Sequence, residues 1–234
     1  MLQISYFKPI KDKQIKFLYE TITKHLHNIE KFKSIEACNQ YANDLKAFMN
    51  GHTKKDPLFK DLRKAINPGY KFYPEVLLEF VKFKSLYLKN PRVKTLDDLY
   101  LYTAHQSSFG FLLLSLGDSF QKPLKLIETL GIIDGLSNIL TNFHAFNKQG
   151  LIHFPFNLIQ DYDIDFDLDG NFLINDKFIH MWDMIAYKVL MLINEVQLTK
   201  HQFDELNQIL VDTFIKDIKS DLTRFEQAEI KNKR

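Results

Sequence analysis

Apolar residues recur at three- and four-residue spacing through most of the sequence, which is the pattern of amphipathic helices. The clearest example is expected over 13–30, where one face carries Ile15, Leu18, Ile22, Leu26 and Ile29. A second helix is expected from about Ser34 to Met49, because Gly51 suits the left-handed conformation that ends many helices. The pattern therefore predicts an all-α chain whose helices are joined by short loops.

Proline and capping residues mark the starts of the next helices. Pro57 and Pro74 each suit a first helical turn, and the helices they open are expected to end before 67–69 and near Leu88. Thr95, with Asp98 three residues later, has the spacing of a capping box. It predicts one long helix over about 96–116 that Gly117 would end.

The C-terminal half continues the helical pattern. A helix pair is expected over 123–146, and a strongly amphipathic helix over 177–196. Thr199 with Gln202 has the spacing of another capping box, which would open a last helix reaching about Arg224.

The segment 163–175 departs from this pattern, because Ile164, Phe166 and Leu168 alternate with aspartates. Asp169-Gly170 then supplies a turn and the alternation resumes, which predicts a small β-hairpin. The stretch 165–176 also has the spacing of a calcium-binding EF-hand loop, with Asp in place of the final Glu. The hairpin is the favoured interpretation and calcium binding the alternative.

Composition narrows the class of protein. The chain has 234 residues and no low-complexity stretch or Pro/Gly-rich linker, so we expect one domain over 1–234. A formal net charge of +2, with scattered lysines, argues against a nucleic-acid partner. The single cysteine, Cys38, suits a reducing compartment. No apolar run approaches a membrane span and no signal or transit pattern opens the chain, so we expect a cytoplasmic protein.

The most specific motif is LGIIDGLSNILTNFHAFNKQGLIHFP, residues 130–155, which resembles without a gap the second signature of squalene and phytoene synthases. The positions that match the family pattern are Leu130, Gly131, Leu136, Asn138, Ile139, Leu140, Gly150 and Pro155. Upstream, 95–117 is similar to the family helix that carries a tyrosine and then two small residues, here Tyr102, Ser107 and Ser108. The resemblance implies the all-α helical bundle of isoprenoid and terpenoid synthases.

Members of this family join two allylic diphosphates, and Mg²⁺ ions bridge the diphosphates to carboxylates four residues apart. The positions that align with the two aspartates of the second signature are Asn142 and Phe146. Other aligned acidic, cationic and hydroxyl positions are replaced as well, by Thr141, Ala145, Leu151 and His153. An amide oxygen coordinates Mg²⁺ weakly and a phenyl ring does not coordinate it.

The first acidic motif of the family is also absent. The acids between residues 1 and 40 are Asp12, Glu20, Glu30 and Glu36, and no two of them are three or four residues apart. A third family aspartate aligns with Ser85. Glu75 and Glu79 do stand four apart, and we interpret them as part of a solvated helix face. We expect no catalytic residue, no metal ligand and no cofactor.

One branch of the family lacks synthase activity and includes the mitochondrial assembly factor for respiratory complex I. Resemblance to this branch implies a pseudoenzyme that acts by binding, either to subunits of a respiratory complex or to a lipid- or prenyl-like ligand. A further hypothesis is a module that binds peripherally at the inner membrane, which the lysines and the aromatic content suggest. The residual pocket would be lined by Tyr102, Ser107, Ser108, Asn138 and Asn142. The alternative is an active Mg²⁺-dependent farnesyl- or geranylgeranyl-diphosphate transferase.

Overall fold

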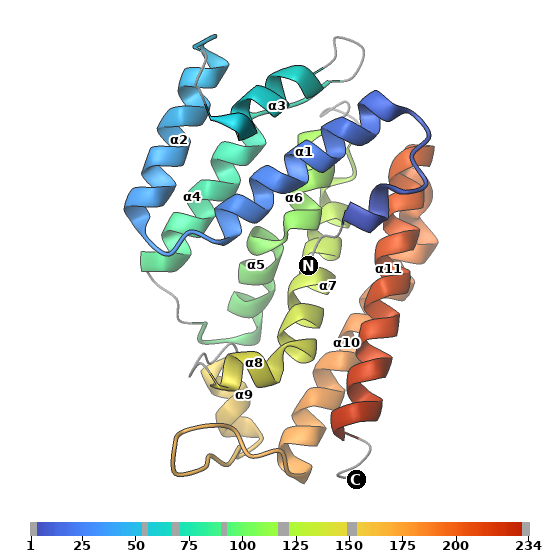
Figure 1. The fold of residues 1–234 in the computed structure, drawn as a ribbon. Coiled ribbons are helices and arrows are strands. Elements are labelled where there is room, and N and C mark those ends of the chain that lie inside the picture. Colours follow the sequence, from blue (N-terminus) through green and yellow to red (C-terminus); the bar gives the residue numbers. More distant parts are fainter. Residues whose placement is uncertain are drawn as a thin grey trace.

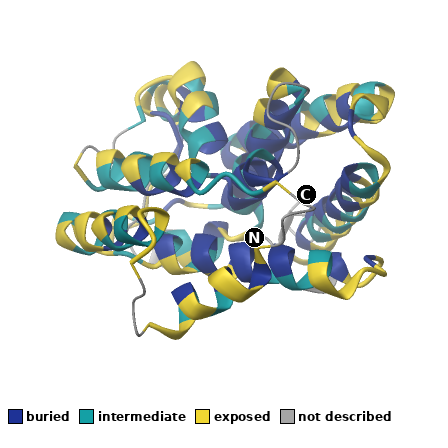
Figure 2. Cartoon of the chain, turned by 90° about the horizontal axis from the view of Figure 1, so that it is seen from above, coloured by how far each residue is buried: buried dark blue, intermediate teal, exposed yellow. Residues whose placement is uncertain are grey.

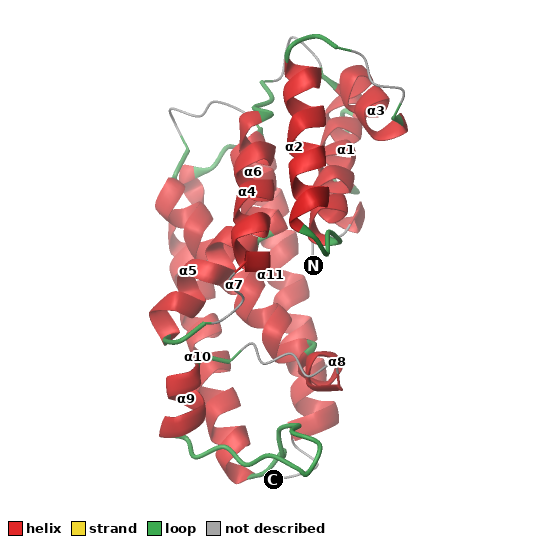
Figure 3. Ribbon diagram, turned by 90° about the vertical axis from the view of Figure 1, so that its left-hand side faces the viewer, coloured by secondary structure: helices red, strands yellow, loops and turns green. Residues whose placement is uncertain are grey.

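The structure is a computed structural model that describes residues 4–52, 56–66, 71–89, 93–116, 122–148 and 154–230. These residues form helices and loops without a strand (Figure 3). The α-helices are α1 (Lys13–Glu30), α2 (Ile35–Met49), α3 (Pro57–Ala65), α4 (Glu75–Lys89), α5 (Leu96–Gln106), α6 (Ser108–Ser115), α7 (Leu124–Thr141), α8 (Phe143–Lys148), α9 (Phe156–Asp161), α10 (Asp176–Thr199) and α11 (Glu205–Phe225). The all-α prediction is confirmed.

Helix α7 runs through the middle of the bundle and packs against α5, α6, α10 and α11 (Figure 1). Helix α1 crosses one end and contacts α3, α4 and α6, while α8 and α9 lie at the other end (Figure 1). Seen from above, the buried residues gather where helices face one another and the outer faces are exposed (Figure 2). Among the described residues, no helix is long and apolar enough to cross a membrane.

Helix α1 follows the sequence pattern closely. Its N-cap is Asp12, whose carboxylate accepts hydrogen bonds from the backbone N–H groups of Gln14 and Ile15. The apolar face is buried as predicted, with Leu18, Ile22, Leu26 and Ile29 at most 1% exposed and Ile15 partly buried. Burying four such side chains contributes about 1.5–3 kcal/mol each before conformational entropy is counted.

The other predicted helix starts depend on short-range hydrogen bonds and are largely confirmed. Ser34 and Asp56 cap α2 and α3, and Thr95 and Asp98 form the reciprocal capping box that opens α5. Gly51 follows α2 with φ of +85°, where an L side chain would be strained. The predicted turn at 67–69 and Gly117 lie outside the described residues.

The prediction of one continuous helix over 96–116 is wrong, because the chain breaks at Ser107. The backbone of Ser107 is extended, with φ −79° and ψ 111°, so α5 ends at Gln106 and α6 begins at Ser108. Its hydroxyl accepts a hydrogen bond from the N–H of Gly110 at 3.0 Å and donates to Oδ2 of Asp134 at 2.8 Å. A serine that caps the next helix in this way competes with the helical backbone.

The capping box predicted at Thr199 and Gln202 is also wrong. Thr199 is the last residue of α10, and its hydroxyl donates to the carbonyl of Glu195. Residues Lys200–Gln202 form a 3₁₀ turn, and the N-cap of α11 is Asp204, which accepts from the N–H of Asn207 at 2.8 Å.

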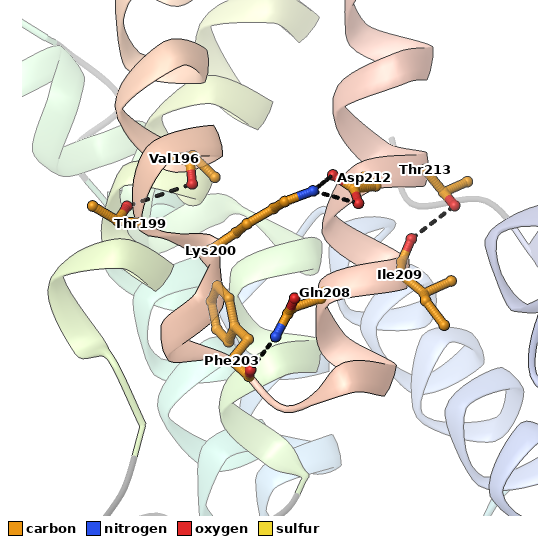
Figure 4. Close-up of polar contacts among 8 residues, drawn as sticks. All are labelled: Val196, Thr199, Lys200, Phe203, Gln208, Ile209, Asp212 and Thr213. Atoms are coloured by element: carbon orange, nitrogen blue, oxygen red, sulfur yellow. Dashed lines mark hydrogen bonds and ion pairs between the residues drawn. The ribbon is translucent and has the colours of Figure 1, made fainter.

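Two side-chain contacts hold the connection after α10 against α11. The ammonium group of Lys200 lies 2.5 Å and 2.6 Å from the carboxylate oxygens of Asp212 (Figure 4). The side-chain amide of Gln208 donates to the carbonyl of Phe203 at 2.7 Å (Figure 4). These contacts join residues of the connection to the first turns of α11, which local capping spacing does not predict.

The predicted hairpin is reduced to a tight turn with a single antiparallel bridge between Phe166 and Phe172. The N–H of Asp167 donates to the carbonyl of Asn171 at 2.8 Å, and Gly170 takes φ of +80° as the Asp-Gly turn requires. The turn geometry is therefore as predicted, whereas strands do not form among the described residues.

Helices α5 and α7 approach each other most closely at two glycines of α7. A Cβ atom built at Gly135 would lie 2.3 Å from Cβ of Thr103, and one at Gly131 would lie 3.0 Å from Cα of Ala104. Real Cβ atoms do not come as close as 2.3 Å, so the contact requires glycine at Gly135, while a side chain at Gly131 would force Ala104 to shift by a few tenths of an ångström. A Cβ atom at Gly110, in contrast, would stay 3.6 Å from its nearest neighbours.

We predict that Gly135→Ala lowers the free energy of unfolding by about 3 kcal/mol, because the added methyl group must push the β-branched Thr103 and its backbone away. Gly110→Ala, the matched control in α6, should change stability by less than about 1 kcal/mol. Chemical denaturation measures both. Equal effects of the two substitutions would contradict the close approach of α5 and α7.

Candidate functional site

Two serines at the break between α5 and α6 meet two carboxylates from distant parts of the chain. Ser108 donates a hydrogen bond to Oε1 of Glu30, at the end of α1. Ser107 donates to Oδ2 of Asp134, in the middle of α7. Both serines are at most 2% exposed and Asp134 is 6% exposed. We call Glu30, Ser107, Ser108 and Asp134 the interior polar cluster.

The pKa values of groups in and around the cluster are shifted by burial and by neighbouring charges. Burial raises the pKa of the Glu30 carboxyl, the hydrogen bond from Ser108 and nearby His27 oppose this effect, and the charge of Asp134 adds to it. Burial also raises the pKa of the Tyr6 phenol, and the negative charges of Asp217 and Asp134 raise it further. The cluster thus concentrates carboxylates in a region of low dielectric, which is costly unless they are hydrogen-bonded.

Lys84 and His27 are basic residues near Glu30. Burial lowers the pKa of Lys84 on α4, and the charge of Lys33 lowers it further, while Glu30 opposes the shift. Nε2 of His27 is buried and has no hydrogen-bond partner among the described residues. A lysine therefore lies close enough to Glu30 for the two charges to affect each other.

The structure separates the five residues that the sequence assigned to a residual pocket into three places. Ser107 and Ser108 lie together in the interior polar cluster. Asn138 and Asn142 lie together at the end of α7, where the Asn142 amide donates to Oδ1 of Asn138 at 2.7 Å. Tyr102 is on α5, and its ring packs against Tyr87 with a centroid distance of 4.8 Å.

The end of α7 does not fit the Mg²⁺ ions that the family resemblance implies. Asn142 is exposed and donates from its side-chain nitrogen to both oxygens of Asn138, and its neutral amide lacks the charge with which a carboxylate holds Mg²⁺. One helical turn further, Phe146 presents a half-buried ring where a carboxylate would be needed. In the part of the chain that the structure describes, no group of three or more His, Cys, Asp or Glu side chains could hold a metal ion. Leu151 and His153 lie outside that part.

The aspartates of the EF-hand-like stretch are bound to other groups rather than directed to a common centre. Asp167 accepts hydrogen bonds from the backbone N–H groups of Asp169 and Asn171. Asp165 accepts from the Asn175 amide at 2.7 Å and lies 3.5 Å from the ammonium group of Lys177. These contacts are those of a turn stabilised by its own side chains.

Sequence reasoning did not identify Glu30 and Asp134 as partners of the two serines. A signal for Asp134 was available, because it is an acid within the apolar run LGIIDGLSNIL of a helix that is buried on most sides. An isolated charged residue in such a run has to be hydrogen-bonded inside the protein. Glu30 gave no such signal, since it stands at the end of an amphipathic helix.

Comparison with solved structures identifies the fold. A dehydrosqualene synthase solved with a bound ligand has a TM-score of 0.69 and 15% sequence identity, over 94% of this chain and 90% of that one. The squalene synthase HpnC from Alicyclobacillus acidocaldarius has a TM-score of 0.71 and 13% identity, over 96% and 86%. No family model and no curated protein sequence matches this chain. The chain therefore has the squalene/phytoene synthase fold, as the resemblance implied.

We predict that Glu30→Gln raises the melting temperature at pH 7 by a few degrees, since about 1 kcal/mol corresponds to about 2–4 °C in a chain of this size. A raised pKa means that Glu30 stabilises the fold below its unfolded-state pKa and loses this contribution as pH rises through the folded-state pKa. Glutamine keeps the oxygen that accepts from Ser108 and removes the buried charge.

The matched control is Glu195→Gln on the exposed face of α10, which should leave the melting temperature unchanged at every pH. The difference between Glu30→Gln and the parent should shrink as pH falls towards 4. A lower melting temperature for Glu30→Gln at pH 7 would show instead that the charged carboxylate is stabilising.

Proposed function

We propose that this protein is a non-catalytic binding protein with the squalene/phytoene synthase fold. The proposal rests on the residues at the end of α7 and the start of α8. There, Asn142 and Phe146 stand at the positions that align with the two aspartates of the family's second signature. Ionisation of an allylic diphosphate depends on Mg²⁺ to neutralise the departing charge, and each 1.4 kcal/mol lost from that stabilisation slows the reaction about tenfold.

The carboxylates that remain inside the bundle support the same conclusion. Glu30 and Asp134 each accept a hydrogen bond from a buried serine hydroxyl. Burial raises the pKa of Glu30, which disfavours the ionised form that a metal ion requires. These two acids come from α1 and α7, and neither has a second acid four residues away on the same helix.

We predict that the protein neither consumes farnesyl or geranylgeranyl diphosphate nor binds a non-hydrolysable farnesyl diphosphate analogue in a Mg²⁺-dependent manner. Calorimetric titration with and without Mg²⁺, together with a product assay, measures both properties. A dehydrosqualene synthase tested under identical conditions is the positive control. Micromolar Mg²⁺-dependent binding, or turnover, would establish the alternative of an active prenyl transferase.

The partner that we infer is a subunit of a membrane-bound respiratory complex, engaged during assembly of the complex and in peripheral contact with the inner membrane. Support comes from resemblance to the family branch without synthase activity and from the outer face of α10. That face exposes the apolar side chains of Tyr187, Leu190, Met191 and Leu198. They recur at helical spacing, as in an amphipathic helix that packs against another surface.

We predict that cells lacking this protein contain less assembled complex I, measured by native electrophoresis and by the rate of NADH oxidation in isolated membranes. The wild-type protein should restore assembly. A variant with Met191→Ser and Leu198→Ser should fail to restore it, because the apolar contact face is lost. The matched control is Asn194→Ser, on the same exposed face, which should restore assembly fully. Normal complex I in the absence of the protein would refute this role.

A further inference from the structure

A pocket of about 470 Å³ opens between α4, α5, α6 and α7, which lie next to one another in the bundle (Figure 3). Its volume is within the range of small-molecule sites. The buried part of its lining carries no polar side chain and consists of Ala104, Gly110, Phe111 and Ile127. Val76, Leu114 and Leu124 extend the apolar lining towards the surface. The pocket is thus suited to an apolar group.

The rim of the pocket is negatively charged. Glu75 and Glu79 stand one turn apart on α4, and Glu128 belongs to α7. Within the described chain, Glu75 and Glu128 form no ion pair, and Glu79 pairs with the exposed Lys82 at 3.2 Å. An exposed pair of this kind contributes little and is easily exchanged. No lysine or arginine belongs to the described lining of the pocket.

The remaining titratable group of the pocket does not offset this charge. Burial lowers the pKa of His105, which disfavours the charged imidazolium, and the nearby carboxylate of Glu128 only partly opposes the shift. Its ring stacks on Phe83, with the centroids 3.9 Å apart and the planes 13° apart. The two rings add an aromatic wall, and aromatic faces attract cations.

We propose that this pocket binds an organic cation, namely an amine with an apolar body. The apolar body would occupy the pocket above Phe111 and Ile127, and the ammonium group would lie among the carboxylates of Glu75, Glu79 and Glu128. An anionic ligand would be repelled by the rim, and a neutral one would gain nothing from it. The site is separate from the interior polar cluster, with which it shares no residue, and does not depend on the proposed function.

Three probes with the same eight-carbon chain test the proposal by calorimetric titration at pH 7: 1-aminooctane, 1-octanol and octyl phosphate. We expect 1-aminooctane to bind about tenfold more tightly than 1-octanol, because the rim carboxylates act together. Octyl phosphate should bind more weakly than 1-octanol. The preference for the amine should also diminish when the salt concentration is raised.

Substitutions of the rim glutamates test whether 1-aminooctane binds in this pocket. Glu75→Gln and Glu128→Gln should each weaken binding of 1-aminooctane about threefold and leave 1-octanol unaffected, because they remove charge and preserve shape. Both residues are exposed, so neither change disturbs the core. Glu195→Gln, on α10 and outside this pocket, should have no effect. Equal affinity for amine and alcohol, no binding of the amine, or unchanged binding by both rim variants would overturn the proposal.

Discussion

The close approach of α5 and α7 determines the rest of the bundle. With no side chain at Gly131 or Gly135, the backbones come near enough for Thr103 and Ala104 to contact the α7 helix directly. This contact sets the register between the two helices. In that register the hydroxyl oxygen of Ser107, one turn after Thr103, lies 2.8 Å from Oδ2 of Asp134. Because α7 also packs against α10 and α11, a displacement here would be transmitted to these two helices.

The break between α5 and α6 is a consequence of the same register. A continuous helix would satisfy the backbone of Ser107 but would leave Asp134 buried in an apolar helix without this donor. The extended conformation lets one hydroxyl cap α6 and serve the carboxylate at the same time. Since a hydrogen bond to a buried carboxylate contributes about 1.5–3 kcal/mol, the contact between Ser107 and Asp134 prevails over the helical propensity of the sequence.

Acidic side chains lie inside the bundle and on its surface, but not at the end of α7. Carboxylates remain where buried serines can donate to them, at Glu30 and Asp134, and on the rim of an outer pocket. They are missing at the end of α7, where the Asn138–Asn142 pair and Phe146 take their place. Inside the bundle, buried serine hydroxyls thus donate to carboxylates that come from two different helices.

The sequence by itself determined most of the helices, the capping box of α5 and the all-α class, because these depend on hydrophobic periodicity and on hydrogen bonds between near neighbours. It also singled out Ser107 and Ser108, though not their partners. Glu30 lies 78 residues from Ser108 in the chain, and no local pattern specifies which distant carboxylate a buried hydroxyl will meet. The start of α11 is set by a local cap, Asp204, which the capping pattern at Thr199 did not identify. The break at Ser107 was decided by tertiary structure, because a buried hydrogen bond to Asp134 outweighed a local helical signal of about 1 kcal/mol.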